Sequence, residues 1–247
     1  MYGQGLHYFA KHTSVVRLDD TGRGMLQDFY ATHTPGLLSI ARLDNEGNIL
    51  FRVSNSSAVA PEVLEESFAK VVPSPDAGVL DILCGETMLA AFTVPLTEGG
   101  NPAGRLVLLI SFEQLVKKFL GPLKASQTRR TWVINRTGIV LDCPNPYHSG
   151  AHIDETTESA KASSLLSIMK KMARGGEGAG TFTINDDRAD GGSPVRNHVV
   201  FMPVSLPGGN YWSLAVATPE QQVLANMTRF RNSWLLVSFT AMGVVLA

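Results

Sequence analysis

Two stretches of the chain share one order of apolar and polar positions. In the first, residues 43–50, an apolar segment leads through a polar turn containing Gly47 into a second apolar segment. In the second, residues 134–141, the same order repeats around Gly138. Glycine adopts a positive φ without strain, so a polar turn closed by glycine between apolar segments is typical of a β-hairpin. The pattern therefore predicts two equivalent hairpins.

Each predicted hairpin is followed by a matching tail. In the first copy a strand ending at Pro95 precedes the apolar run 104–112, and in the second a strand ending at Pro203 precedes the run 211–219. A Glu-Gln pair follows the proline at nearly the same distance in both copies. We interpret the chain as one small α/β unit repeated in tandem.

The spacing of apolar residues predicts the individual elements. The expected strands are residues 37–43, 49–53, 78–83, 88–96, 105–112, 131–135, 139–142, 180–184, 197–205 and 211–217. The expected helices are residues 6–18, 24–34, 62–72, 113–120, 159–173 and 219–231, with a break or kink at Gly22 and Gly24. Each repeat then has the order strand, strand, helix and three strands, which predicts an α+β fold of two antiparallel sheets with helices packed on them.

The same pattern divides the chain into five parts. A helical segment, residues 1–36, precedes a first unit at 37–121 and a second at 122–218, with the boundary at Gly121-Pro122. A linker helix at 219–233 then leads into residues 234–247.

Residues 234–247 carry no charged side chain and follow Arg229 and Arg231, with Trp234 at their start. Tryptophan and arginine suit a membrane interface, whereas a full span needs roughly 20 apolar residues. We therefore expect the start of a transmembrane helix, a buried C-terminal helix being the alternative. The first sixteen residues contain no continuous apolar run like that of a signal peptide, so we interpret the sequence as a fragment, cut after one membrane helix and inside the next.

The charge and the cysteine content of the chain argue against two kinds of partner, nucleic acids and metal ions. The formal net charge is −1 and Lys and Arg are thinly spread, which argues against nucleic-acid binding. Cys84 and Cys143 lie in different repeats without metal-ligand spacing. We favour two buried or semi-buried free thiols over a disulfide between them.

Taken in order, these features resemble the double Cache sensor domains, tandem PAS-like modules of bacterial transmembrane receptors. The resemblance covers nearly the whole chain and depends on the order of its motifs, which are the turns at Gly47 and Gly138, Asp142-Cys143-Pro144-Asn145, residues 178–182, the strands containing Pro95 and Pro203, and residues 212–216. It implies a periplasmic or extracellular region of an inner-membrane receptor, anchored at both ends and homodimeric, with the first unit distal to the membrane.

The resemblance also implies a place for a ligand, in the distal unit between the sheet and the loop-helix segment that covers it. The candidate ligand-binding residues are Phe51, Arg52, Ser54, Asp81, Glu86 and Thr93. An arginine fork binds carboxylates bidentately, although Arg52 also fits a solvent-facing strand position. Asp81 and Glu86 equally fit surface charges at strand ends. Residues 62–79 contain no Arg, Trp or Tyr, unlike the covering segment of the amino-acid-binding subset.

Other polar clusters favour simpler interpretations. Tyr147, His148, His152 and His198 could form a metal or pH-sensing group, but exposed or capping histidines are the preferred alternative. Asp186, Asp187 and Asp190 lack the later glutamate and internal glycine of a calcium loop and predict a hairpin turn. The glycine-rich residues 175–180 precede a strand, whereas phosphate loops open a helix. No nucleophile-elbow motif is present, so no catalytic residue, metal or cofactor is expected.

We therefore expect a sensor region that binds a small molecule in its distal unit and relays the change to the membrane helix. A histidine kinase is the preferred output domain, with a chemoreceptor or cyclic-dinucleotide enzyme as alternatives. A periplasmic protein-interaction module and a membrane-tethered enzyme are the rival hypotheses from other classes.

Overall fold

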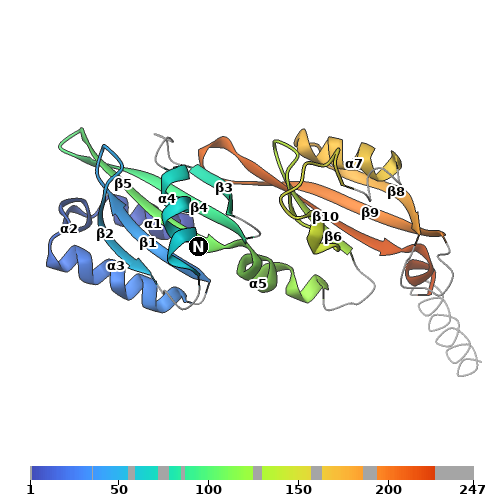
Figure 1. Ribbon diagram of the computed structural model, residues 1–247. Helices are drawn as coiled ribbons and strands as arrows, with labels where there is room; N and C mark the ends of the chain where they lie inside the picture. The colour runs from blue at the N-terminus through green and yellow to red at the C-terminus, as the bar shows by residue number, and fades with distance from the viewer. Residues whose placement is uncertain are drawn as a thin grey trace, which may run out of the picture.

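The computed structural model describes residues 2–34, 36–54, 59–71, 78–84, 87–124, 130–156, 163–185 and 194–225. Two five-stranded antiparallel sheets lie end to end along an elongated molecule (Figure 1). Helices cover the faces of both sheets, and one helix, α5, joins them. The α+β class predicted from the sequence is confirmed.

Both sheets have the same strand order. The first, β2-β1-β5-β4-β3, comprises β1 (Leu37–Leu43), β2 (Ile49–Ser54), β3 (Gly78–Cys84), β4 (Thr87–Glu98) and β5 (Asn101–Ser111). The second, β7-β6-β10-β9-β8, comprises β6 (Arg130–Asn135), β7 (Val140–Asp142), β8 (Gly178–Asn185), β9 (Pro194–Ser205) and β10 (Tyr211–Pro219). Each strand of the second sheet occupies the place of the corresponding strand of the first sheet, which confirms the tandem repeat.

The two predicted hairpin turns are built alike. Gly47 and Gly138 have φ values of 92° and 83°, in the region that favours glycine. The side-chain oxygen of Asp44 accepts from the backbone N–H of Asn48 at 2.8 Å, and that of Asn135 accepts from Ile139 at 2.9 Å. Each turn is thus closed by an acidic or amide side chain as well as by glycine.

Both faces of the first sheet are buried. Helices α1 (Tyr2–Ala10), α2 (Thr13–Arg17) and α3 (Asp20–His33) cover one face, and α4 (Pro61–Val71) covers the other. Successive side chains of a strand point to opposite faces, so Leu108 of β5 packs in the cluster of the N-terminal helices and Leu109 in that of α4. This double cover explains why every residue of β1 is buried.

The N-terminal helices differ from the sequence prediction. The helix expected at 6–18 is two helices, because the chain turns at Lys11-His12 between α1 and α2. The break expected at Gly22 and Gly24 is absent, since α3 runs through both glycines. A Cβ on Gly22 would lie 2.1 Å from the carbonyl oxygen of Ser14, so this glycine permits the close approach of α2 and α3.

The second sheet is covered less completely. Helix α7 (Ser163–Ala173) closes one face over a cluster that includes Trp132 and Phe182. On the opposite face, α5 (Phe112–Lys124) packs only near β6 and the start of β10, and Val200 and Met202 of β9 remain exposed. Helix α5 continues through Gly121-Pro122, so the predicted unit boundary falls inside a helix. Two short 3-10 helices, η1 (Pro146–His148) and η2 (Pro207–Gly209), complete the described elements.

The chain leaves the second sheet through β10, and residues 220–225 are helical. The rest of the predicted linker helix and the apolar residues 234–247 lie outside the described residues, as do residues 159–162 of the helix expected at 159–173. Within the described part of the chain, no helix has the length and apolar character that a membrane span requires. Cys84 and Cys143 are both buried thiols that form no disulfide with each other, as preferred from the sequence.

The two glycines of α3 form a matched pair for substitution. We expect Gly22→Ala to lower the free energy of unfolding by about 2 kcal/mol or more, because the new methyl group meets the backbone of α2. A methyl group on Gly24 would have no atom within 4 Å, so Gly24→Ala should raise the free energy of unfolding by about 0.5–1 kcal/mol through helix propensity. Urea unfolding of both variants measures the difference, and equal effects would contradict the close approach.

Candidate functional site

The two units meet at the carboxylate of Asp81. This residue lies on β3 and faces the second unit, where two side chains donate to it. Asn135 Nδ2 lies 3.0 Å from Oδ2, and Trp212 Nε1 lies 2.8 Å from Oδ1. Each carboxylate oxygen therefore accepts one hydrogen bond from the neighbouring unit.

The second unit positions both donors through its backbone. Asn135 ends β6, and its Oδ1 accepts from the backbone N–H groups of Thr137 and Ile139, so the amide nitrogen is directed outward. Trp212 is the second residue of β10 and the direct strand partner of Asn135. A further contact between units lies beside them, where Asn210 Nδ2 donates to the carbonyl oxygen of Val79 at 3.1 Å.

Burial dominates the electrostatics of this contact. Removal of Asp81 from water raises the pKa of its carboxyl above the ordinary value of 3.8, and the hydrogen bonds from Asn135 and Trp212 oppose that rise only in part. Both donors are uncharged and no cation is among the causes of the shift. The units are thus joined by a half-buried carboxylate held by neutral partners.

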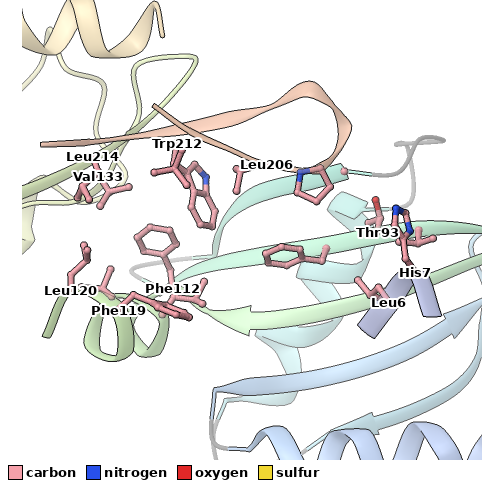
Figure 2. A pocket seen from close by; sticks show the side chains of 17 residues that line it. Leu6, His7, Thr93, Phe112, Phe119, Leu120, Val133, Leu206, Trp212 and Leu214 are labelled. Carbon is pink, nitrogen blue, oxygen red and sulfur yellow. The ribbon is translucent and has the colours of Figure 1, made fainter. Parts of the chain in front are cut away.

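Beside this contact lies a cavity of about 700 Å³ whose walls come from both units (Figure 2). The first unit contributes residues of α1 and β4, and the second contributes residues of β6, β9 and β10. The connecting helix α5 supplies Phe112, Phe119 and Leu120, which lie opposite Val133 and Leu214 in the close view. The volume lies in the range of small-molecule sites.

The cavity is apolar over most of its surface. None of the described residues that line it is Asp, Glu, Lys or Arg. The rings of Phe112 and Trp212 meet edge to face in its wall, with centroids 5.2 Å apart. The indole N–H of Trp212 is bound to Asp81, so the contact between the units also fixes one wall of the cavity.

The structure describes five of the six candidate ligand-binding residues and does not bring those five together in one site. Thr93 lines the cavity, and Asp81 lies behind Trp212. Phe51 packs in the cluster formed with the N-terminal helices, and Ser54 ends β2. Glu86 lies outside the described residues.

Arg52 lies on the α4 side of the first sheet. Its Nη1 is 2.5 Å from Glu65 Oε1 of α4, and the two form an ion pair at the edge of the sheet. Beneath α4, the described side chains Leu64, Phe68 and Val71 are buried against β4 and β5. The region where the resemblance implies a ligand is therefore closely packed in its described part.

The histidines of the second unit do not converge. His152 Nδ1 accepts from the backbone N–H of Asp154, and His198 Nε2 lies 3.3 Å from Glu220 Oε1. Tyr147 is 91% exposed. Over the described ranges, no three His, Cys, Asp or Glu side chains are grouped as metal ligands would be. The three aspartates at 186, 187 and 190 lie outside those ranges.

Comparison with solved structures places the fold among sensor domains. The ligand-binding domain of the amino acid chemoreceptor PctB of Pseudomonas aeruginosa PAO1, in complex with L-Arg, is similar with a TM-score of 0.57 and 14% identity over 94% of this chain and 85% of that one. The extracellular domain of the candidate histidine kinase vpHK1S-Z8 has a TM-score of 0.54 and 13% identity, over 93% and 87% of the two chains. The fold is that of a double Cache sensor domain.

A third similar structure is larger. An extracellular ligand-binding receptor from Desulfohalobium retbaense DSM5692 matches with a TM-score of 0.58 and 16% identity over 87% of this chain. The match covers 36% of that receptor, so this chain spans about a third of its length. No family model and no curated protein matches the sequence.

The sequence reasoning missed most of the cavity. Its walls combine residues far apart in the chain, such as Leu6, Phe119 and Trp212, and no local pattern links them. One signal was available in the repeat itself. The turn residue is Asp44 in the first copy and Asn135 in the second, and only the amide offers an N–H group to a neighbouring carboxylate.

Asp81→Asn tests the electrostatics of the contact. A carboxyl whose pKa is raised in the folded state contributes stability that is complete below 3.8 and is lost as pH rises through the folded pKa. We therefore expect the free energy of unfolding of the native chain to fall relative to that of Asp81→Asn as pH rises from about 3 to about 7. Urea unfolding across this range measures the gap. If the native chain instead became more stable relative to Asp81→Asn as pH rises, the carboxylate would be stabilised as an anion, which would contradict this account.

Asn135→Asp tests the partner of Asp81. An aspartate closes the equivalent turn at residue 44, so the turn should form while a second carboxylate replaces the donor. We expect a loss of about 2 kcal/mol at neutral pH that recovers in acid, when one carboxyl becomes protonated. Asp44→Asn is the matched control. Hydrogen bonds from Asn48 lower the pKa of the Asp44 carboxyl, so this variant should cause a much smaller loss at neutral pH, which also fades in acid. An equally small loss in both variants at neutral pH would contradict the role of Asn135.

Proposed function

We propose that this chain is the extracytoplasmic ligand-sensing region of a membrane-anchored signalling receptor, with a histidine kinase as the foremost output domain. The observation that carries the proposal is the cavity built by both units beside the Asp81 contact. A ligand that contacts both units favours the arrangement in which its contacts are complete, and so shifts the equilibrium between arrangements.

The similar structures support this function. They are extracellular or ligand-binding domains, one of a chemoreceptor in complex with L-Arg and one of a candidate histidine kinase. A chemoreceptor or a cyclic-dinucleotide enzyme is therefore the alternative output. The extracytoplasmic location and the membrane anchor are part of the proposal, as is a homodimeric receptor.

A single strand, β10, connects the cavity wall to residues 220–225. Strand β10 has Trp212, a residue of the cavity wall, near its start and ends at Pro219, after which residues 220–225 are helical. Because the strand is hydrogen-bonded to both β6 and β9, a displacement at one end is carried to the other. We propose that this strand relays ligand binding toward the membrane-proximal end (Figure 1).

A second candidate function is a module that senses another protein. The close packing of Leu64, Phe68 and Val71 under α4 favours it, because the distal unit then needs no small ligand to complete its core. In that case the cavity between the units would not bind metabolites.

Thermal unfolding of the 247-residue chain with a panel of amino acids, organic acids, amines, alcohols and lipids distinguishes the two functions. A ligand at a hundredfold excess over its Kd stabilises by about 2.7 kcal/mol, which raises the Tm of a chain of this size by about 5–10 °C. We expect at least one chemical class to produce such a rise. A Tm unmoved by every class would contradict small-molecule sensing and leave the protein-interaction module as the function.

A further inference from the structure

The polar groups of the cavity lie at one end. In Figure 2, His7 of α1 and Thr93 of β4 lie close together, with Leu6 beside them. Away from this end, the cavity is bounded by aromatic and aliphatic side chains that include Phe112, Phe119 and Leu214. The site therefore offers a small polar end and a long apolar wall.

This chemistry disfavours a zwitterionic ligand. A free amino acid would place both an ammonium and a carboxylate in the cavity, and the described lining offers no acidic or guanidinium side chain to pair with them. Charged groups buried without partners are strongly disfavoured, whereas apolar cavities bind apolar molecules readily.

The apolar wall extends beyond the cavity along β9. Val204 lines the cavity, and Met202 and Val200 follow it on the same side of the strand, because alternate residues share a face. All three side chains are exposed. An elongated apolar ligand can thus lie partly in the cavity and continue along this strand.

The connecting helix also presents an aromatic side chain to the ligand space. Phe119 is 58% exposed although it lines the cavity, so much of its ring is in contact with solvent when nothing is bound. A ligand that covers this ring removes apolar surface from water, which favours binding.

We infer that the cavity between the units binds an elongated amphiphile, with a hydrocarbon body along α5 and β10 and one small polar group near His7 and Thr93. Medium-chain alcohols have this chemistry, and so do medium-chain fatty acids whose single carboxylate lies at the solvent-exposed His7. The inference rests on the proposed sensing function and names the ligand class for the same site.

Calorimetric titration of the full chain with primary alcohols from hexanol to decanol, and with decanoic acid, tests the ligand class. Each added methylene that becomes buried should increase the association constant about fourfold, with one ligand bound per chain. Decanoic acid distinguishes the head groups, since binding of the acid alone or the alcohol alone identifies which polar end the site accepts. L-alanine is the zwitterionic control and should not bind in the cavity.

Two exposed aromatic residues on helices provide matched variants that locate the site. Phe119 lines the cavity, whereas Tyr8 of α1 is 62% exposed and does not line it. We expect Phe119→Ser to weaken decanol binding about tenfold, because the ligand loses its aromatic cover. Tyr8→Ser should leave the affinity unchanged.

The outcomes separate the inference from the function that it rests on. Binding of alcohols or decanoic acid that Phe119→Ser weakens and Tyr8→Ser does not supports the inference. Equal affinities for hexanol and decanol, or equal effects of the two variants, would overturn it. Binding of only amino acids or other polar metabolites would also overturn it while leaving sensing intact. Binding of none of the alcohols and not of decanoic acid would overturn the inference, and a Tm unmoved by the whole ligand panel would overturn the sensing function as well.

Discussion

The arrangement of the two units depends on one half-buried carboxylate. Asp81 accepts a hydrogen bond from Asn135 and another from Trp212, and both donors belong to the opposite unit. Neutral donors satisfy the oxygens without cancelling the charge, so burial still raises the pKa of the carboxyl. Such a contact specifies how the units meet more than it stabilises them. It also fixes the indole ring that forms part of the cavity wall.

The cavity exists because helices cover the first sheet more completely than the second, although the two sheets have the same strand order. In the first unit, N-terminal helices and α4 close both faces. In the second unit α7 closes one face, and α5 covers the other only in part, leaving Val200, Met202 and Val204 of β9 exposed. The duplicated frame and the strand order are shared, so the difference lies in what packs on the sheets. An apolar space between the units is the direct consequence.

Much of the fold could be predicted because local patterns determine it. Alternating apolar residues and the turn glycines Gly47 and Gly138 locate the strands, and their repetition implies the tandem sheets. Gly22 misled the prediction because its effect depends on the distance to Ser14 in another helix. The contacts of Asp81 could not be predicted for a similar reason, since Asn135 and Trp212 follow it in the chain by 54 and 131 positions. The cavity is a product of packing between units, which no local pattern contains.

In this account the ligand contacts both units and is not bound within one of them alone. Binding between α5 and β10 would order the interface and act on the strand that continues into residues 220–225. Hydrogen–deuterium exchange of the full chain with and without decanol tests this claim most directly. The account predicts slower exchange in α5 and β10 together on binding. Slower exchange confined to α4 and β3, or unchanged exchange throughout, would contradict it.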